Sequence, residues 1–171
     1  MIRLLTGSTH TGKTLLAQRL LERHGAPYLS IDHLKMGLIR SGMCPLTPES
    51  TDEALTAVLW PVVREIVKTV VENGQSLTVE GCYIPFNWRE DFDASCLPHI
   101  RFLCLVFSEA YIRTRFDTIQ THANAIERRK DDSFCTMELL LAENRRNLEA
   151  CRRRGLPYYL IDGPYAPPLD W

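Results

Sequence analysis

The sequence predicts an α/β protein in which a parallel β-sheet is covered by helices on both faces. Strand-like apolar runs alternate along the chain with segments whose apolar residues recur at helical spacing. This alternation is typical of parallel strands joined by right-handed crossover helices. The run 100–107 is apolar at nearly every position, as expected of a strand buried on both faces. The glycine-bearing stretch 7–14 separates the first strand from the first helix and predicts a tight turn there.

The first strand is predicted over residues 1–6, and the turn that follows it carries the most specific pattern in the chain. Eight residues match G-x-x-x-x-G-K-[ST] at every position, namely Gly7, Ser8, Thr9, His10, Thr11, Gly12, Lys13 and Thr14. The backbone N–H groups from Gly7 to Gly12 are expected to point at phosphate oxygens, and the next helix adds the positive end of its dipole. Lys13 should reach the β- and γ-phosphates of ATP, and the Thr14 hydroxyl should bind Mg²⁺. We therefore assign Gly7, Thr9, His10, Thr11, Gly12, Lys13 and Thr14 to nucleotide binding, with the His10 side chain pointing outward.

The next elements bring a carboxylate to the end of a second strand. The first helix is predicted to end at Gly25, and residues 26–31 form the second strand. A short helix over 32–40 begins with Asp32, and the Gly/Pro/Ser-rich loop 41–48 is interpreted as a mobile flap.

The remaining elements continue the alternation. Ser50 and Glu53 predict a capping box for a helix that runs to about residue 72. The next elements are a strand at 76–79, a turn-rich segment at 85–93, a strand at 100–107 and a helix from Ser108 to about 121. A polar segment at 124–133 is interpreted as a solvated lid. It is followed by a helix at 137–154, a strand at 157–162 and an extended tail.

Charged residues follow the first three strands, at the edge where open parallel sheets bind ligands. Lys13, Asp32 and Glu80 occupy these positions. Asp32 is predicted to accept the proton of a substrate hydroxyl or to orient that hydroxyl, and its simpler interpretation is a helix cap. Glu80 is predicted to hold Mg²⁺ through water on the substrate side, and its simpler interpretation is a structural carboxylate. Lys35 and Arg40 are candidates for binding an anionic acceptor, or are surface residues.

Positively charged side chains beside the predicted lid are expected to stabilise the negative charge that develops on a transferred phosphoryl group. Six arginines lie in or next to the lid: Arg113, Arg115, Arg128, Arg129, Arg145 and Arg146. Arginine runs are more often solvated faces, so we expect two of the six to function. Arg128 and Arg129 are the catalytic candidates because they lie in the lid itself, and Arg113 is a candidate for contacting the nucleotide.

Composition excludes several classes of partner. The chain has 171 residues, which predicts a single domain, and its 20 basic and 21 acidic residues give a formal net charge of −1. This balance gives no electrostatic case for duplex nucleic acid or an anionic membrane as the main partner. The absence of a long apolar run and of a charged-then-apolar leader predicts a cytoplasmic protein. Six cysteines without C-x-x-C spacing predict free thiols.

In this order, the phosphate motif, Asp32, Glu80-Gly81 and the arginine-bearing lid resemble the small-molecule P-loop kinases of the adenylate kinase-like group. That group includes adenylate, shikimate and gluconate kinases, the chloramphenicol phosphotransferase and zeta-toxin types, and 2-phosphoglycerate kinase. The resemblance covers about residues 1–162. It implies a P-loop NTPase three-layer sandwich whose five-stranded parallel sheet has the order 2-3-1-4-5, with an acceptor flap at about 33–60 and a lid at about 118–136.

The resemblance also implies an activity and further site residues. It implies transfer of the ATP γ-phosphate to a small-molecule acceptor with Mg²⁺, and it places Asp162 and Pro164 in the adenine pocket. Any C-terminal helix of such relatives must be missing or very short here, because the chain stops soon after the fifth strand. Acceptor specificity is expected in residues 33–60 and 82–95, and the sequence leaves the acceptor and the oligomeric state open.

Two alternative functions remain. One is a nucleotide-binding regulatory module that catalyses nothing, and the other is a kinase of nucleic-acid 5′ ends. A basic groove expected of the latter is not indicated by the near-neutral chain. A GTPase would need an Asn-Lys-x-Asp motif, which the sequence lacks.

Overall fold

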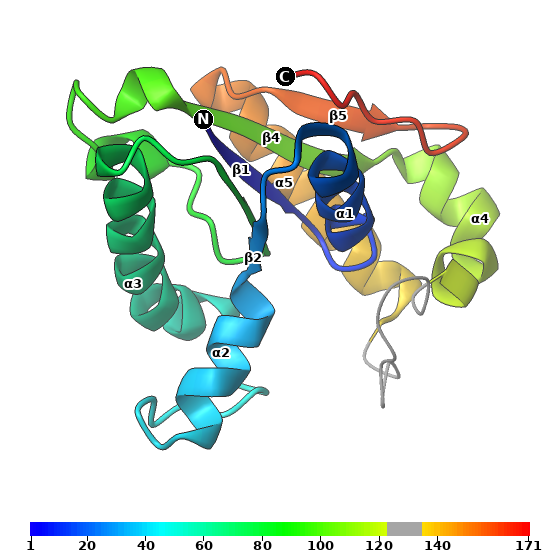
Figure 1. Cartoon of the computed structure of the whole chain (residues 1–171). Coiled ribbons are helices and arrows are strands. Elements are labelled where there is room, and N and C mark those ends of the chain that lie inside the picture. The colour runs from blue at the N-terminus through cyan, green and yellow to red at the C-terminus, as the bar shows by residue number, and fades with distance from the viewer. Residues whose placement is uncertain (123–134) are drawn as a thin grey trace.

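A five-stranded parallel sheet forms the centre of the computed structural model, which describes residues 1–122 and 135–171 (Figure 1). The strands are β1 (Ile2–Gly7), β2 (Tyr28–Ser30), β3 (Leu77–Glu80), β4 (Ile100–Phe107) and β5 (Tyr158–Ile161). Their order is β2-β3-β1-β4-β5, so the order implied by the resemblance is confirmed. Because all the neighbouring pairs are parallel, the carboxyl ends of the strands meet at one edge of the sheet.

Helices join the strands as the sequence predicts. They are α1 (Lys13–His24), α2 (Ile31–Arg40), α3 (Asp52–Glu72), α4 (Glu109–Thr121) and α5 (Met137–Arg154), with 3₁₀ turns η1 (Trp88–Asp91) and η2 (Leu97–His99) before β4. Gly25 ends α1 in the left-handed conformation, and Ser108 caps α4 by accepting from the Tyr111 N–H. Across residues 1–122 and 135–171, none of the helices combines the length and the apolar character that crossing a bilayer requires.

Two apolar clusters cover the two faces of the sheet, which gives the predicted three layers. Because side chains alternate along a strand, neighbouring residues of β1 and β4 enter different clusters. On one face α3 packs with the loop between β3 and β4, through residues that include Leu55, Leu59, Val63, Tyr83 and Trp88. On the other face α1 and α4 pack against β1, β4 and β5, through residues that include Leu5, Leu16, Leu20, Leu105, Ile112 and Ile161. All six cysteines are free thiols, as predicted.

The predicted capping box at the start of α3 is wrong. The N-cap residue is Thr51, whose side chain accepts from the Ala54 N–H. The Ser50 hydroxyl instead accepts from the Thr47 N–H at 3.0 Å and closes the turn before the helix. Both hydroxyls precede the same apolar stripe, so their order along the chain did not indicate which one would cap the helix.

An extended tail takes the place of a C-terminal helix. After β5 the chain turns back and follows α1 without forming a helix (Figure 1). Tyr165 meets the start of α1, where its hydroxyl donates to the Gly12 carbonyl at 2.7 Å. Asp170 meets the end of α1, where it pairs with Arg23 at 3.3 Å. The tail therefore spans the length of α1.

Candidate active site

The turn between β1 and α1 is compact and closed by its own side chains. The Ser8 carbonyl accepts from the Thr11 hydroxyl and from the Lys13 ammonium group, both at 2.8 Å. His10 has a φ of 64°, the only positive value at a non-glycine position in the described residues, and Gly12 has a φ of 78°. The turn therefore adopts a conformation that most side chains disfavour, and its shape suits a phosphate cradle. All the residues assigned to the cradle lie together here: Gly7, Thr9, His10, Thr11, Gly12, Lys13 and Thr14.

Lys13 is a buried cation surrounded by acidic groups. Its exposed fraction is 8%. Burial by itself lowers the pKa of Lys13, but Cys82, Glu80 and Asp32 outweigh it, so the pKa lies above its ordinary value. Lys13 therefore stays protonated at neutral pH and lies within electrostatic range of both predicted strand-end carboxylates.

Thr14 and Glu80 form the second feature of the site. Glu80 is the last residue of β3, is 1% exposed, and lies opposite Leu5 of β1 in the parallel register. The Thr14 hydroxyl lies 3.3 Å from Glu80 Oε1. A hydroxyl and a carboxylate oxygen are donors that Mg²⁺ prefers, and this ion needs only one or two protein ligands when phosphates supply others. The two side chains thus fit a magnesium ion that binds together with a nucleotide. In the part of the chain described, no three or more His, Cys, Asp or Glu side chains are grouped as a metal site.

Asp32 belongs to a hydrogen-bonded set that the sequence did not predict. It lies in the first turn of α2, where its Oδ1 pairs with Lys35 Nζ at 2.8 Å. Lys35 also donates to the Tyr83 hydroxyl at 2.9 Å, and its Nζ lies 5.2 Å from the centroid of the Tyr83 ring. Burial lowers the pKa of Lys35, but Asp32 and Tyr83 outweigh this and raise it. Lys35 therefore holds α2 against the loop after β3, and it fixes one oxygen of Asp32.

A further acidic group and a thiol lie near Lys13. Glu143 of α5 accepts from the Thr9 backbone N–H, and its Oε2 is buried without a hydrogen-bond partner in the described residues. Burial raises the pKa of Glu143, and Asp52 adds to this effect. Burial also raises the pKa of Cys82, which Lys13 opposes. Cys82 is therefore a thiol at neutral pH, which argues against its use as a nucleophile.

Several of the predicted residues contact groups other than the turn between β1 and α1. Arg113 pairs with Glu109 on its own helix at 2.8 Å, and Arg145 reaches the same carboxylate at 3.4 Å. Arg40 is exposed in the last turn of α2. Asp162 follows β5 and accepts a hydrogen bond from the Ser108 hydroxyl. None of these contacts joins the phosphate loop, while Arg128 and Arg129 lie outside the described residues.

The tail reaches the phosphate loop through a residue next to Pro164. Tyr165 donates to the Gly12 carbonyl, and the Arg19 guanidinium lies 5.4 Å from the centroid of the Tyr165 ring. Burial raises the pKa of Tyr165, which keeps the hydroxyl protonated as a donor. Asn147 of α5 supports the loop from another element, since its amide donates to the Ser8 hydroxyl at 3.2 Å. No local pattern in the sequence predicted either contact.

Replacing Gly12 with alanine is expected to lower the free energy of unfolding by roughly 1–2 kcal/mol. The left-handed conformation disfavours a side chain, and the new Cβ would lie 2.8 Å from the Tyr165 ring. The matched control is Gly163→Ala in the tail, because a Cβ at Gly163 meets nothing within 4 Å. Urea unfolding of both variants measures the difference. An unchanged midpoint for Gly12→Ala would contradict the packing of Tyr165 on the loop.

Solved structures share this fold, although no family model and no curated protein sequence matches the chain. A gluconokinase from Sinorhizobium meliloti 1021 is 18% identical, with a TM-score of 0.53, and the match covers 98% of this chain and 83% of that protein. A sugar kinase from Janibacter sp. HTCC2649 is also 18% identical with a TM-score of 0.53, over 94% of this chain and 84% of that protein. The chain therefore has the fold of small-molecule P-loop kinases, and the resemblance stated from the sequence is confirmed at the level of the fold.

Proposed function

We propose that this protein is an ATP-dependent phosphotransferase that moves the γ-phosphoryl group of ATP to a hydroxyl group of a small molecule. One observation carries the proposal. Lys13, Glu80 and Asp32 lie at the carboxyl ends of three neighbouring parallel strands, and both carboxylates lie within electrostatic range of Lys13. The fold shared with small-molecule kinases supports the same class of reaction.

The phosphate loop and Lys13 would hold the transferring group. The backbone N–H groups of residues 7–12 and the start of α1 would bind the β- and γ-phosphates, and Lys13, which donates to the Ser8 carbonyl, would bind their oxygens instead. Thr14 and Glu80 would hold Mg²⁺, whose positive charge stabilises the charge that develops on the phosphate oxygens. The protein thus supplies position and charge, which are the main requirements of phosphoryl transfer.

Asp32 would handle the proton of the acceptor. Within the described residues Lys35 contacts Oδ1 of Asp32 and leaves Oδ2 to accept from the acceptor hydroxyl. Tyr83 fixes Lys35 from the other side, so the carboxylate is held in one orientation. Proton transfer to a positioned carboxylate contributes roughly 10²- to 10⁴-fold to a rate. The acceptor would lie between α2 and the loop after β3.

The test is a screen of acceptors for release of ADP from Mg-ATP. The panel contains sugars, sugar acids, amino alcohols and phosphorylated hydroxy acids, together with an oligonucleotide that carries a 5′ hydroxyl. We expect one class of small molecule to raise ADP release above the rate with water alone. Equal rates with and without every acceptor would favour the regulatory module. Acceleration by the oligonucleotide alone, with a steep salt dependence, would favour the end kinase.

Replacing Glu80 with glutamine is expected to raise the Mg²⁺ concentration that gives half-maximal ATP binding by roughly tenfold or more. The change keeps the size of the side chain but removes the negative charge beside Thr14. Calorimetric titration of ATP at several Mg²⁺ concentrations measures the effect without an acceptor. The control is Glu65→Gln on the surface of α3, which should leave the Mg²⁺ dependence unchanged. The same dependence in both variants would remove Glu80 from the proposed metal site.

A further inference from the structure

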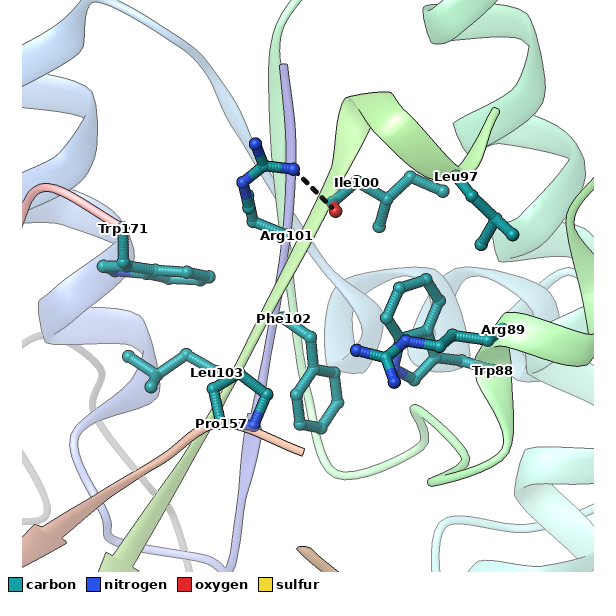
Figure 2. A pocket seen from close by; sticks show the side chains of 9 residues that line it. All are labelled: Trp88, Arg89, Leu97, Ile100, Arg101, Phe102, Leu103, Pro157 and Trp171. Atoms are coloured by element: carbon teal, nitrogen blue, oxygen red, sulfur yellow. Dashed lines mark hydrogen bonds between the residues drawn. The ribbon is translucent and has the colours of Figure 1, made fainter. Parts of the chain in front are cut away.

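A concave site lies at the opposite edge of the sheet from the turn between β1 and α1. It surrounds the amino-terminal part of β4 and has a volume of about 390 Å³ (Figure 2). The site exists because β5 pairs with β4 only from Cys104 onward, which leaves 100–103 with β1 on one side and no strand on the other. Pro157, directly before β5, forms part of the lining. This pocket is distinct from the proposed nucleotide site, since the two lie at opposite ends of the strands.

Aromatic rings form walls on both sides of β4. Trp88 and Phe102 lie on one side, stacked with an interplanar angle of 13° and their centroids 6.0 Å apart. Trp171, from the C-terminal tail, lies on the other side of the strand (Figure 2). Flat aromatic walls of this kind favour a flat aromatic ligand.

The polar side chains of the pocket are hydrogen-bond donors. Arg89 extends from η1 against the Trp88 ring, with its guanidinium carbon 5.4 Å from the ring centroid (Figure 2). Arg101 donates to the backbone carbonyls of Pro98 and Ile100 at 3.2 Å and 3.4 Å. Neither arginine forms an ion pair with any of the described residues. The lining thus includes two positively charged side chains.

Two residues of the lining carry an indole N–H group. The Nε1 atoms of Trp88 and Trp171 are buried and find no acceptor in the described part of the chain. The carboxylates next to these residues in the sequence are already paired, Glu90 with Arg154 at 3.5 Å and Asp170 with Arg23 at 3.3 Å. The lining therefore offers donors and apolar surface but no acidic side chain.

We propose that this pocket binds a small anion that carries a planar aromatic ring. The ring would lie against the aromatic walls, and its anionic group would receive hydrogen bonds from Arg89 and Arg101. The volume of the pocket falls in the lower part of the range for small-molecule sites, which suits a ligand of one or two fused rings. Guanidinium groups bind carboxylates and phosphates alike, so the recognised feature is the ring together with a negative charge.

The experiment compares two ligands of the same shape by calorimetry with the full chain. Naphthalene-2-carboxylate carries the charge, and naphthalene-2-carboxamide is its neutral counterpart. We expect the carboxylate to bind roughly tenfold more tightly, because a charged acceptor gains more from the guanidinium groups. A carboxylic acid without a ring, such as acetate, should not bind at the same concentrations. Equal affinity of the carboxylate and the carboxamide would overturn the proposal.

Substitutions in the lining test whether the carboxylate binds in this pocket. Arg89→Gln and Arg101→Gln should each weaken the binding of the carboxylate by roughly tenfold. The affinity for the carboxamide should stay unchanged in both variants. Lys68→Gln on α3 removes one positive charge elsewhere and should have no effect. Lys13→Ala should also have no effect, which separates this site from the proposed kinase activity. Unchanged binding in both arginine variants, or competitive displacement of the carboxylate by Mg-ATP, would refute the site.

Discussion

Replacing Lys13 with alanine is expected to lower ATP-dependent phosphoryl transfer by roughly 10²- to 10³-fold or more. Lys13 is the buried cation of the turn between β1 and α1, where its ammonium group donates to the Ser8 carbonyl. The fold should survive, because the Ser8 carbonyl keeps its hydrogen bond from the Thr11 hydroxyl. The rate of ADP release with the acceptor found by the screen measures the loss, and urea unfolding measures the fold.

A surface lysine provides the control for this prediction. Lys68→Ala removes a lysine that pairs with Glu65 on the outside of α3, so its rate should equal that of the unchanged protein. Calorimetric titration with Mg-ATP gives a second readout that needs no acceptor. Lys13→Ala should lower the affinity for ATP in this titration. Full activity together with unchanged ATP binding in Lys13→Ala would refute the assignment of the phosphate loop.

Replacing Asp32 with asparagine is expected to lower turnover by roughly 10²-fold or more and to change ATP affinity little. Asparagine keeps an oxygen that accepts from Lys35, so the arrangement of Lys35 and Tyr83 should persist. It lacks the charge that would accept the proton of the acceptor hydroxyl. Steady-state rates with varied acceptor and separate ATP titrations distinguish the two effects.

The comparison variant is Asp117→Asn on the exposed side of α4, which makes the same chemical change away from the site. Its turnover should match the unchanged protein. If Asp32→Asn loses ATP binding instead of turnover, Asp32 belongs to the nucleotide site. If its turnover is unchanged, another group handles the proton, and Glu143 beside the Thr9 N–H is the next residue to replace.

Local patterns were enough to predict the features that depend on neighbouring residues. The phosphate turn follows from eight consecutive positions, and β1, β4, α1 and α4 follow from apolar periodicity and end signals. Because the carboxyl ends of parallel strands lie at one edge of a sheet, the sequence also predicted that Asp32 and Glu80 lie at the same edge. The order of the strands came from the resemblance, since periodicity does not determine which strands become neighbours.

Contacts between distant segments had no local signal. Tyr165 reaches Gly12 across 153 positions, and Lys35 reaches Tyr83 across 48. The predicted capping box of α3 was wrong for a local reason, since the Ser50 hydroxyl accepts a hydrogen bond in the preceding turn and Thr51 caps the helix.

The sequence by itself determined the turn at residues 7–14, the alternation of strands and helices, and the placement of Lys13, Asp32 and Glu80 near the carboxyl ends of the first three strands. The tertiary structure decided which side chains complete the site, namely Tyr83 on Lys35, Glu143 at Thr9 and Tyr165 on Gly12. It also produced the pocket beside β4, where the tail brings Trp171 to the sheet edge that β5 leaves open. The physical reason is the separation along the chain over which each feature is determined. Hydrogen-bonded turns and periodic burial depend on adjacent residues, whereas contacts between elements depend on how the whole chain packs.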